Sequence, residues 1–223
     1  EQSREAFSRW RKAGAHRYLL RIEASEPSLY EKIHPKDSLH SYEVRKNALT
    51  LLRETGYQVG TGVMIGLPWQ EKEHLAADLL FIKELDIDMV GMGPYVEHEL
   101  TPLYEYRHLL LPLEERFFLS MRMIALLRII MKDNNIAATR AMQTIFPHGR
   151  RFAVKIGANV IMPNLTPLKY REDYLLYENK PGLKEEAEDS LRNLKKSLAE
   201  IDHEIAFGEW GDALHYQNRM NPA

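Results

Sequence analysis

Short apolar runs alternate with stretches of helical periodicity along this chain, and the alternation predicts its architecture. Helical spacing of apolar residues predicts helices over 4–14, 41–55, 71–85, 113–132 and 148–156. Apolar runs predict strands over 17–23, 57–68, 89–95, 136–142 and 158–164, with a Ser/Pro-rich loop between the first strand and about Leu39. Because strands and helices alternate, the sequence predicts successive βα units around a parallel sheet.

The first predicted strand ends in two opposite charges. With a period of two, Leu19, Arg21 and Glu23 lie on one face of the strand, although strands of a parallel sheet are usually apolar on both faces. Ligands of parallel α/β proteins bind beyond the carboxyl ends of the strands, so Arg21 and Glu23 are expected at the rim of such a site.

Desolvating an isolated ion costs several kcal/mol, so these charges should be matched by each other or by a ligand. An amino-acid ligand would satisfy Glu23 with its ammonium and an arginine with its carboxylate. The two candidates are Arg21 and Arg45, which lies on the next predicted helix. A structural salt bridge between the strand and a neighbouring loop is an equal alternative.

Composition narrows the possible partners. The 223 residues carry 30 basic and 32 acidic side chains, well mixed, so no long-range field favours nucleic acid or a membrane surface. Cysteine is absent, which excludes disulfides and any metal or iron-sulfur site with cysteine ligands from this chain. No apolar run reaches the roughly 20 residues of a membrane helix, and a cytoplasmic protein is expected. The chain starts without methionine, and a predicted helix begins within its first residues, as expected for the remainder of a longer polypeptide.

The pattern changes from Pro181 onward. The segment "LKEEAEDSLRNLKKSLAEIDHEI" places its leucines and isoleucines on one helical stripe. We predict a domain over 1–180 and a helical cover over 181–223, since the stripe is too short for a zipper.

Three other motifs have ordinary explanations. Gly60, Gly62 and Gly66 lie inside a predicted strand and depart from the G-x-G-x-x-G spacing, so we interpret them as close-packing glycines. The "VEHEL" run offers metal ligands, but adjacent loop residues usually point apart. "HGRR" after Pro147 is interpreted as a solvated helix start, with an anion site as the alternative.

Five segments together resemble one family. They are "AGAHRYLLRIEAS", "LRETGYQVGTGVMIGLPWQ", "DLLFIKELDIDMVGMGPYVEHELTPL", "NIAATRAMQTIFPHGR" and "GANVIMPNLTPLKYREDYLLYENKPG", in this order over about residues 5–182. They are similar to radical S-adenosylmethionine enzymes of the HydE type, the FeFe-hydrogenase maturases. Methylornithine synthase and biotin synthase are related families.

The resemblance implies an α/β fold, a TIM-like (βα) barrel of which this chain supplies strands four to eight, plus a carboxyl-terminal amphipathic helix. It also implies S-adenosylmethionine and a [4Fe-4S] cluster whose cysteine ligands lie outside this chain. The implied partners are a small-molecule substrate, the missing amino-terminal half of the barrel and hydrogenase maturation proteins.

The resemblance also implies roles for individual residues. The cofactor-binding positions are Arg21, Glu23, Arg45 and Met64. The substrate-binding positions are Thr139, Arg140 and Ala141 on strand seven, Met162 on strand eight, and Tyr174 and Tyr177 beyond it. Ordinary packing is an alternative for Met64 and the two tyrosines.

This chain departs from the family in two places. Trp69 stands where relatives usually carry glycine, and Arg140 replaces what is often a small hydroxyl residue. We expect the carboxyl-terminal part of a HydE-like enzyme that cleaves S-adenosylmethionine to a 5'-deoxyadenosyl radical. Its substrate would be a small sulfur-containing or amino-acid-derived molecule in H-cluster assembly. The alternatives are a methylornithine synthase or biotin synthase relative, and a cluster-free half barrel that only binds a partner.

Overall fold

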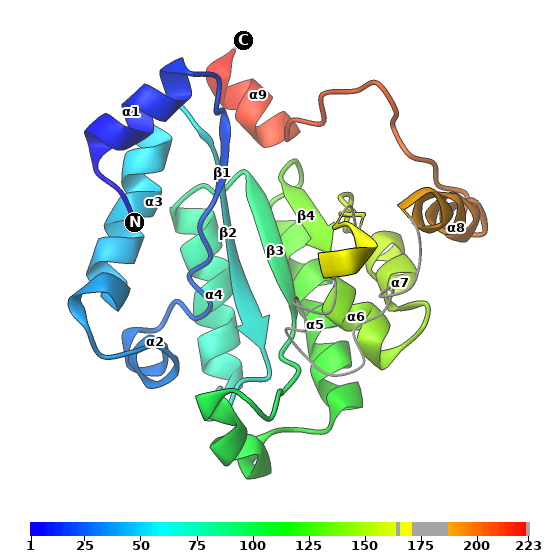
Figure 1. The fold of residues 1–223 in the computed structure, drawn as a ribbon, viewed down its shortest axis with the longest axis horizontal. Helices are drawn as coiled ribbons and strands as arrows, with labels where there is room; N and C mark the ends of the chain where they lie inside the picture. The colour runs from blue at the N-terminus through cyan, green and yellow to red at the C-terminus, as the bar shows by residue number, and fades with distance from the viewer. Residues whose placement is uncertain (164–165, 171–186, 222–223) are drawn as a thin grey trace.

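A parallel sheet of four strands runs through the centre of the protein, in the order β1-β2-β3-β4 (Figure 1). The structure is a computed structural model that describes residues 1–163, 166–170 and 187–221. The strands are β1 (Arg17–Leu19), β2 (Gln58–Ile65), β3 (Met89–Pro94) and β4 (Asn135–Ala138). The helices are α1 (Arg4–Lys12), α2 (Pro27–Ile33), α3 (Tyr42–Glu54), α4 (Lys72–Glu84), α5 (Leu113–Ile130), α6 (Arg140–Ile145), α7 (Gly149–Lys155), α8 (Ala187–Ala199) and α9 (Leu214–Met220). Short 3-10 helices are η1 (Ser38–His40), η2 (Pro102–Leu109) and η3 (Leu168–Tyr170).

Each strand pairs with its neighbour in sequence, as predicted for successive βα units. Gly60 pairs with Met89, and Met89 in turn pairs with Asn135. Since parallel neighbours need a crossover, a helix follows each of the strands β1 to β3 before the next strand begins. The predicted helices over 41–55, 71–85, 113–132 and 148–156 are confirmed as α3, α4, α5 and α7, to within one or two residues at each end.

Two predicted strands are corrected. The run over 136–142 leaves the sheet at Ala138, and Arg140 and Ala141 form the first turn of α6, with Thr139 at its N-cap position. The segment "RAMQTI" consists mostly of good helix formers, which explains the early change of structure. In the second run, of which the structure describes residues 158–163, the pairing recorded is an isolated bridge between Ala137 and Val160.

The predicted loop up to Leu39 is also corrected, because it contains the helix α2. Glu26 caps this helix, with its carboxylate accepting from the backbone N–H of Leu29 at 2.8 Å. Pro27 occupies the first helical position, where a missing N–H costs nothing. Both start signals of this helix, the capping Glu26 and Pro27 after it, are local features of the sequence.

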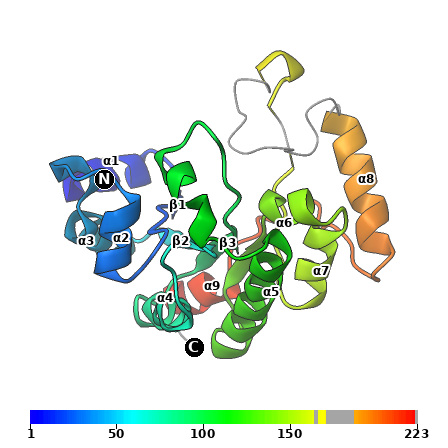
Figure 2. The ribbon, with the colours of Figure 1, turned by 90° about the horizontal axis from the view of Figure 1, so that it is seen from below.

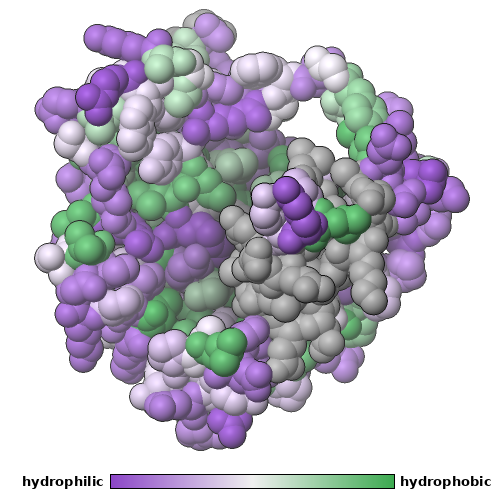
Figure 3. All heavy atoms as spheres, in the orientation of Figure 1, coloured by the Kyte–Doolittle hydropathy of each residue, from purple (hydrophilic) through white to green (hydrophobic). Residues whose placement is uncertain are grey.

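The two faces of the sheet differ in character. The helices α3, α4 and α5 cover one face and bury Val59, Val63, Val90 and Ile136 in the main core. Viewed from below, α3, α4 and α5 form an arc on this side, and among the described residues no α-helix covers the opposite face, called the open face below (Figure 2). Figure 3 looks onto the open face, where hydrophobic and hydrophilic side chains lie side by side over the strands.

The carboxyl-terminal part covers the molecule at two places. Leu198 of α8 is buried in the main core, and Leu194, Ile201 and Ile205 pack against it, as the amphipathic stripe predicted. The short helix α9, which the sequence did not predict, lies at the end of the sheet where the strands begin (Figure 1). Within the described residues, none of the helices has the length and apolarity needed to span a bilayer.

Candidate ligand-binding site

The open face of the sheet is lined by glycines on its two central strands. Gly60 and Gly62 of β2 lie beside Met89, Gly91 and Gly93 of β3 in the register of the sheet. A Cβ atom at Gly62 would clash with the carbonyl oxygen of Gly91 and lie 2.5 Å from Nη1 of Arg21. Glycine at these positions thus lets the side chain of Arg21 lie across β2 and β3, and the interpretation of Gly60 and Gly62 as close-packing glycines is confirmed. We call this face of the sheet, over β2 and β3, the trough.

Arg21 and Glu23 lie at the carboxyl end of this trough and bind each other. Nε and Nη2 of Arg21 donate to the two carboxylate oxygens of Glu23 at 2.6 and 2.9 Å. The remaining bonds of Arg21 go to the backbone, from Nη1 to the Gly91 oxygen at 2.7 Å and from Nη2 to the Val63 oxygen at 3.1 Å. Arg21 therefore spans β2 and β3 and is the structural salt bridge that was one of the two predicted alternatives.

Two residues near the carboxyl ends of the strands have a backbone conformation that favours glycine. Glu23 has φ of 65° and Trp69 has φ of 62°. Such conformations cost roughly 1–3 kcal/mol and concentrate at functional sites. Trp69 thus has a backbone conformation that usually requires glycine, and its ring packs on Tyr106 with a centroid distance of 4.4 Å.

Arg45 of α3 reaches the same region from the side. Its Nε donates to the carboxylate of Glu1 at 2.5 Å, and its Nη1 donates to the backbone oxygen of Arg21 at 3.2 Å. The side chains of Arg45 and Glu1 are only 16% and 12% exposed, so this ion pair is largely shielded from water. The structure therefore shows a carboxylate on Arg45, supplied by the chain itself.

His34, at the end of α2, belongs to this group of residues and was not predicted. Its Nε2 lies 3.3 Å from Nη1 of Arg45, and its ring stacks on Tyr30 at a centroid distance of 3.8 Å. Burial lowers the pKa of the His34 imidazole. The only signal in the sequence was an aromatic residue four positions before a histidine, in a segment predicted to be a loop.

The remaining predicted positions are spread over two regions. Met64 lies on the trough face, half-buried beside Tyr95 and Leu67. The hydroxyl of Thr139 lies against Gly93, and within the described residues this buried oxygen has no hydrogen-bond partner.

Arg140 and Ala141 follow on α6 rather than on a strand, and Met162 is 55% exposed. Tyr174 and Tyr177 lie outside the described residues. The structure thus brings Met64 and Thr139 to the trough, and the roles of all these positions stay predictions.

The possible metal ligands of the "VEHEL" run are engaged differently. Glu97 accepts from Nη1 of Arg116 at 2.7 Å, and Arg116 is only 2% exposed. No group of three histidine, cysteine, aspartate or glutamate side chains suited to a metal ion occurs in the part of the chain that the structure describes.

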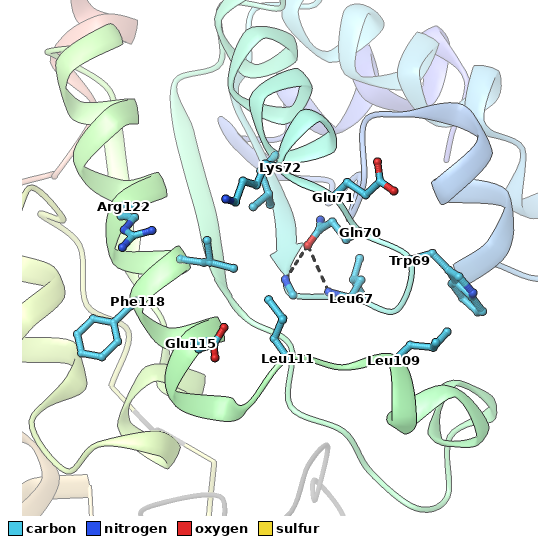
Figure 4. A pocket seen from close by; sticks show the side chains of 13 residues that line it. Leu67, Trp69, Gln70, Glu71, Lys72, Leu109, Leu111, Glu115, Phe118 and Arg122 are labelled. Atoms are coloured by element: carbon cyan, nitrogen blue, oxygen red, sulfur yellow. Dashed lines mark hydrogen bonds between the residues drawn. The ribbon is translucent and has the colours of Figure 1, made fainter.

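A separate cavity of about 700 Å³ lies on the other side of the sheet, between α4 and α5 (Figure 4). Leucines such as Leu67 and Leu111 line it, and Lys72, Glu115 and Arg122 stand at its edge. Gln70 also lines the cavity, and its Oε1 accepts from the backbone N–H of Gly66 at 2.6 Å. None of the predicted site residues lines this cavity, so the trough remains the candidate site.

Comparison with known proteins identifies the relatives of this chain. Over 180 residues it is 48% identical to the FeFe hydrogenase maturase subunit HydE of Thermotoga maritima, and the matched stretch is 81% of this chain. The chain is a homologue of HydE. It covers 49% of that relative, so it spans about half the length of the HydE protein it matches. No protein-family model matches the chain.

Solved structures extend the HydE relationship to the fold. Methylornithine synthase (PylB) superposes with a TM-score of 0.69 and 21% identity, covering 92% of this chain and 56% of that structure. HydG, a maturase of the FeFe-hydrogenase, superposes with a TM-score of 0.67 and 18% identity, covering 89% of this chain and 43% of HydG. At these identities the likeness shows a common fold. The predicted resemblance to radical S-adenosylmethionine enzymes of the HydE type is confirmed.

Proposed function

We propose that this chain is the carboxyl-terminal part of a HydE-like radical S-adenosylmethionine enzyme. Its open trough would hold the cofactor's amino-acid moiety and a small sulfur-containing or amino-acid-derived substrate used in H-cluster assembly. The observation that carries the proposal is the ion pair between Arg45 and Glu1, at the edge of the trough in a HydE homologue. It supports the assignment of Arg45 as a carboxylate ligand.

The residues of the trough suit an amino-acid moiety. A guanidinium offers planar, paired donors for a carboxylate, and Arg45 already holds one through Nε. Within the described residues, the carboxylate of Glu23 accepts side-chain hydrogen bonds from Arg21 alone. Each of its oxygens can accept a second hydrogen bond, for example from an ammonium group.

When bound, S-adenosylmethionine and a [4Fe-4S] cluster would supply the radical chemistry, and the protein would supply binding and orientation. This chain has no cysteine, so the cluster ligands would come from outside it. Arg45 would orient the carboxylate, and the Arg21–Glu23 pair would fix the carboxyl end of the trough. The hydroxyl of Thr139 would be the donor or acceptor for a substrate over β3.

The proposed assembly also gives β1 a neighbour. β1 is the first strand of the sheet and pairs only with β2 in this structure. An edge strand is a ready site for further pairing, and Leu19, the last residue of β1, is 42% exposed. Strands of an amino-terminal half barrel would pair here.

Cofactor binding to the complete protein tests the proposal. Arg45→Gln should weaken S-adenosylmethionine binding, measured by isothermal titration calorimetry, by roughly tenfold to a hundredfold, because a charged hydrogen bond is worth about 1.5–3 kcal/mol. Decarboxylated S-adenosylmethionine should bind both proteins alike. Arg122→Gln is the matched control, since Arg122 is an exposed arginine at the separate cavity. Equal affinities of wild type and Arg45→Gln for S-adenosylmethionine would disprove the assignment.

A further inference from the structure

The imidazole of His34 sits between a carbonyl group and a guanidinium. Its Nδ1 lies 2.9 Å from the backbone oxygen of Tyr30, and its Nε2 lies 3.3 Å from Nη1 of Arg45. The ring is fixed by stacking on Tyr30 with an interplanar angle of 17°. Tyr30 is fully buried, so this support is rigid.

The partners of His34 determine its tautomer. A carbonyl oxygen can only accept, so the hydrogen is on Nδ1, and the guanidinium can only donate, so Nε2 presents its lone pair. Both contacts are satisfied only by the neutral imidazole. Burial lowers the pKa of His34, and the charges of Arg45 and His40 lower it further, so the neutral state is favoured against the Tyr30 hydrogen bond and the Glu23 charge, which raise the pKa.

The donors of Arg45 are divided between two sides of its guanidinium. The two hydrogens of Nη1 point to the backbone oxygen of Arg21 and to His34, and Nε donates to Glu1. Among the described residues, Nη2 makes no recorded hydrogen bond. The edge formed by Nε and Nη2, which is the paired fork that carboxylates prefer, therefore faces away from His34. Glu1 occupies Nε of this edge, so a ligand carboxylate would take the place of Glu1.

We propose that His34 is a positioning residue, which accepts from Nη1 of Arg45 and so holds the Nε–Nη2 edge toward a ligand carboxylate. The inference rests on the proposed function, because it takes Arg45 as the carboxylate ligand. The arginine side chain loses rotamer freedom when it is fixed. A guanidinium already held by His34 and by the Arg21 carbonyl does not incur that cost when the ligand binds.

Two substitutions of His34 separate positioning from packing. His34→Phe keeps a flat ring for stacking on Tyr30 but removes the acceptor. His34→Gln removes the ring but offers a carbonyl oxygen that can accept from Arg45. The complete protein carrying each substitution is titrated with S-adenosylmethionine and with decarboxylated S-adenosylmethionine, and a thermal unfolding curve verifies that each variant is folded.

We expect His34→Phe to weaken S-adenosylmethionine binding about fivefold, as for the loss of one ordinary hydrogen bond. Its affinity for the decarboxylated compound should stay unchanged, and His34→Gln should bind both compounds within about twofold of wild type. An equal loss for both compounds would show a packing role and overturn the inference, as would unchanged S-adenosylmethionine binding by His34→Phe.

The Arg45→Gln variant keeps the two proposals distinguishable. If Arg45→Gln loses S-adenosylmethionine affinity and His34→Phe does not, the inference about His34 fails and the proposed function stands. If Arg45→Gln binds like wild type, both fail together.

Discussion

Replacing His215 by glutamine is expected to loosen the helix α9 from the sheet. The imidazole of His215 lies between two carboxylates, with Nε2 2.6 Å from Asp86 and Nδ1 2.9 Å from Asp133. Both contacts need a donor from the ring, which only the protonated imidazole provides. Because α9 has only seven residues, tertiary contacts of this kind must keep it folded.

The size and the pH dependence of this effect follow from the geometry. Burial lowers the pKa of His215, but the hydrogen bond to Asp133 and the charge of Asp86 outweigh burial, and the net pKa is raised. A hydrogen bond to a charged group is worth about 1.5–3 kcal/mol, and the two carboxylates are 39% and 35% exposed, so we discount the pair to about 1–2 kcal/mol. This stabilisation is fully present below the ordinary histidine pKa of about 6.5 and is lost as the pH rises through the raised folded pKa.

Amide hydrogen exchange of residues 214–220 measures the effect locally. After correction for intrinsic exchange rates, protection in the wild type should fall by roughly fivefold to thirtyfold between about pH 6 and pH 9. His215→Gln should show the lower protection at both pH values. His203→Gln, at an exposed histidine of the same region, is the control and should behave as wild type. If the amide protection of α9 in the wild type does not change with pH, the reasoning is refuted.

Two further predictions concern the sheet and a buried acid. Gly62→Ala should destabilise the protein by about 2–3 kcal/mol in urea unfolding, because its Cβ meets backbone. Gly60→Ala should cost less than half of this, because its Cβ meets the flexible ends of side chains; equal losses would contradict the trough packing. Burial raises the pKa of Asp78 to about 6, so ionisation destabilises the fold as the pH rises from about 4 to 6. Asp78→Asn should therefore add about 2 kcal/mol at pH 8 and nearly nothing at pH 4, and a loss at pH 8 would contradict it.

The helices and the order of the strands could be predicted because their signals are local. Helical periodicity and stops such as Gly56, which has φ of 85°, fix α3 to within a residue. The strand-internal glycines also indicated close packing, and the structure explains them by the approach of Arg21 and the neighbouring strand. Periodicity is a property of one segment, so it survives without any knowledge of the tertiary fold.

Features that depend on distant residues could not be predicted. In the run over 158–163, backbone pairing with β4 is limited to a bridge in which the N–H of Ala138 donates to the Val160 oxygen at 2.8 Å, and Oδ1 of Asn159 accepts from the N–H of Ile136 at 2.8 Å. The helix α9 depends on contacts such as that from the N–H of Ala213 to the Gln58 side chain at 2.9 Å, 155 residues away in sequence. Neither arrangement leaves a periodic pattern.

The number of free donors separates the two arginines that the sequence treated as equal candidates. A guanidinium has five N–H groups. Arg21 uses four of them on Glu23, Gly91 and Val63, which leaves one for a ligand and no paired fork. Arg45 uses Nη1 on the protein and keeps the Nε–Nη2 edge, on which a carboxylate already sits. The count of bound donors thus supports the proposal that Arg45, and not Arg21, is the carboxylate ligand, a distinction that residue type and spacing could not make.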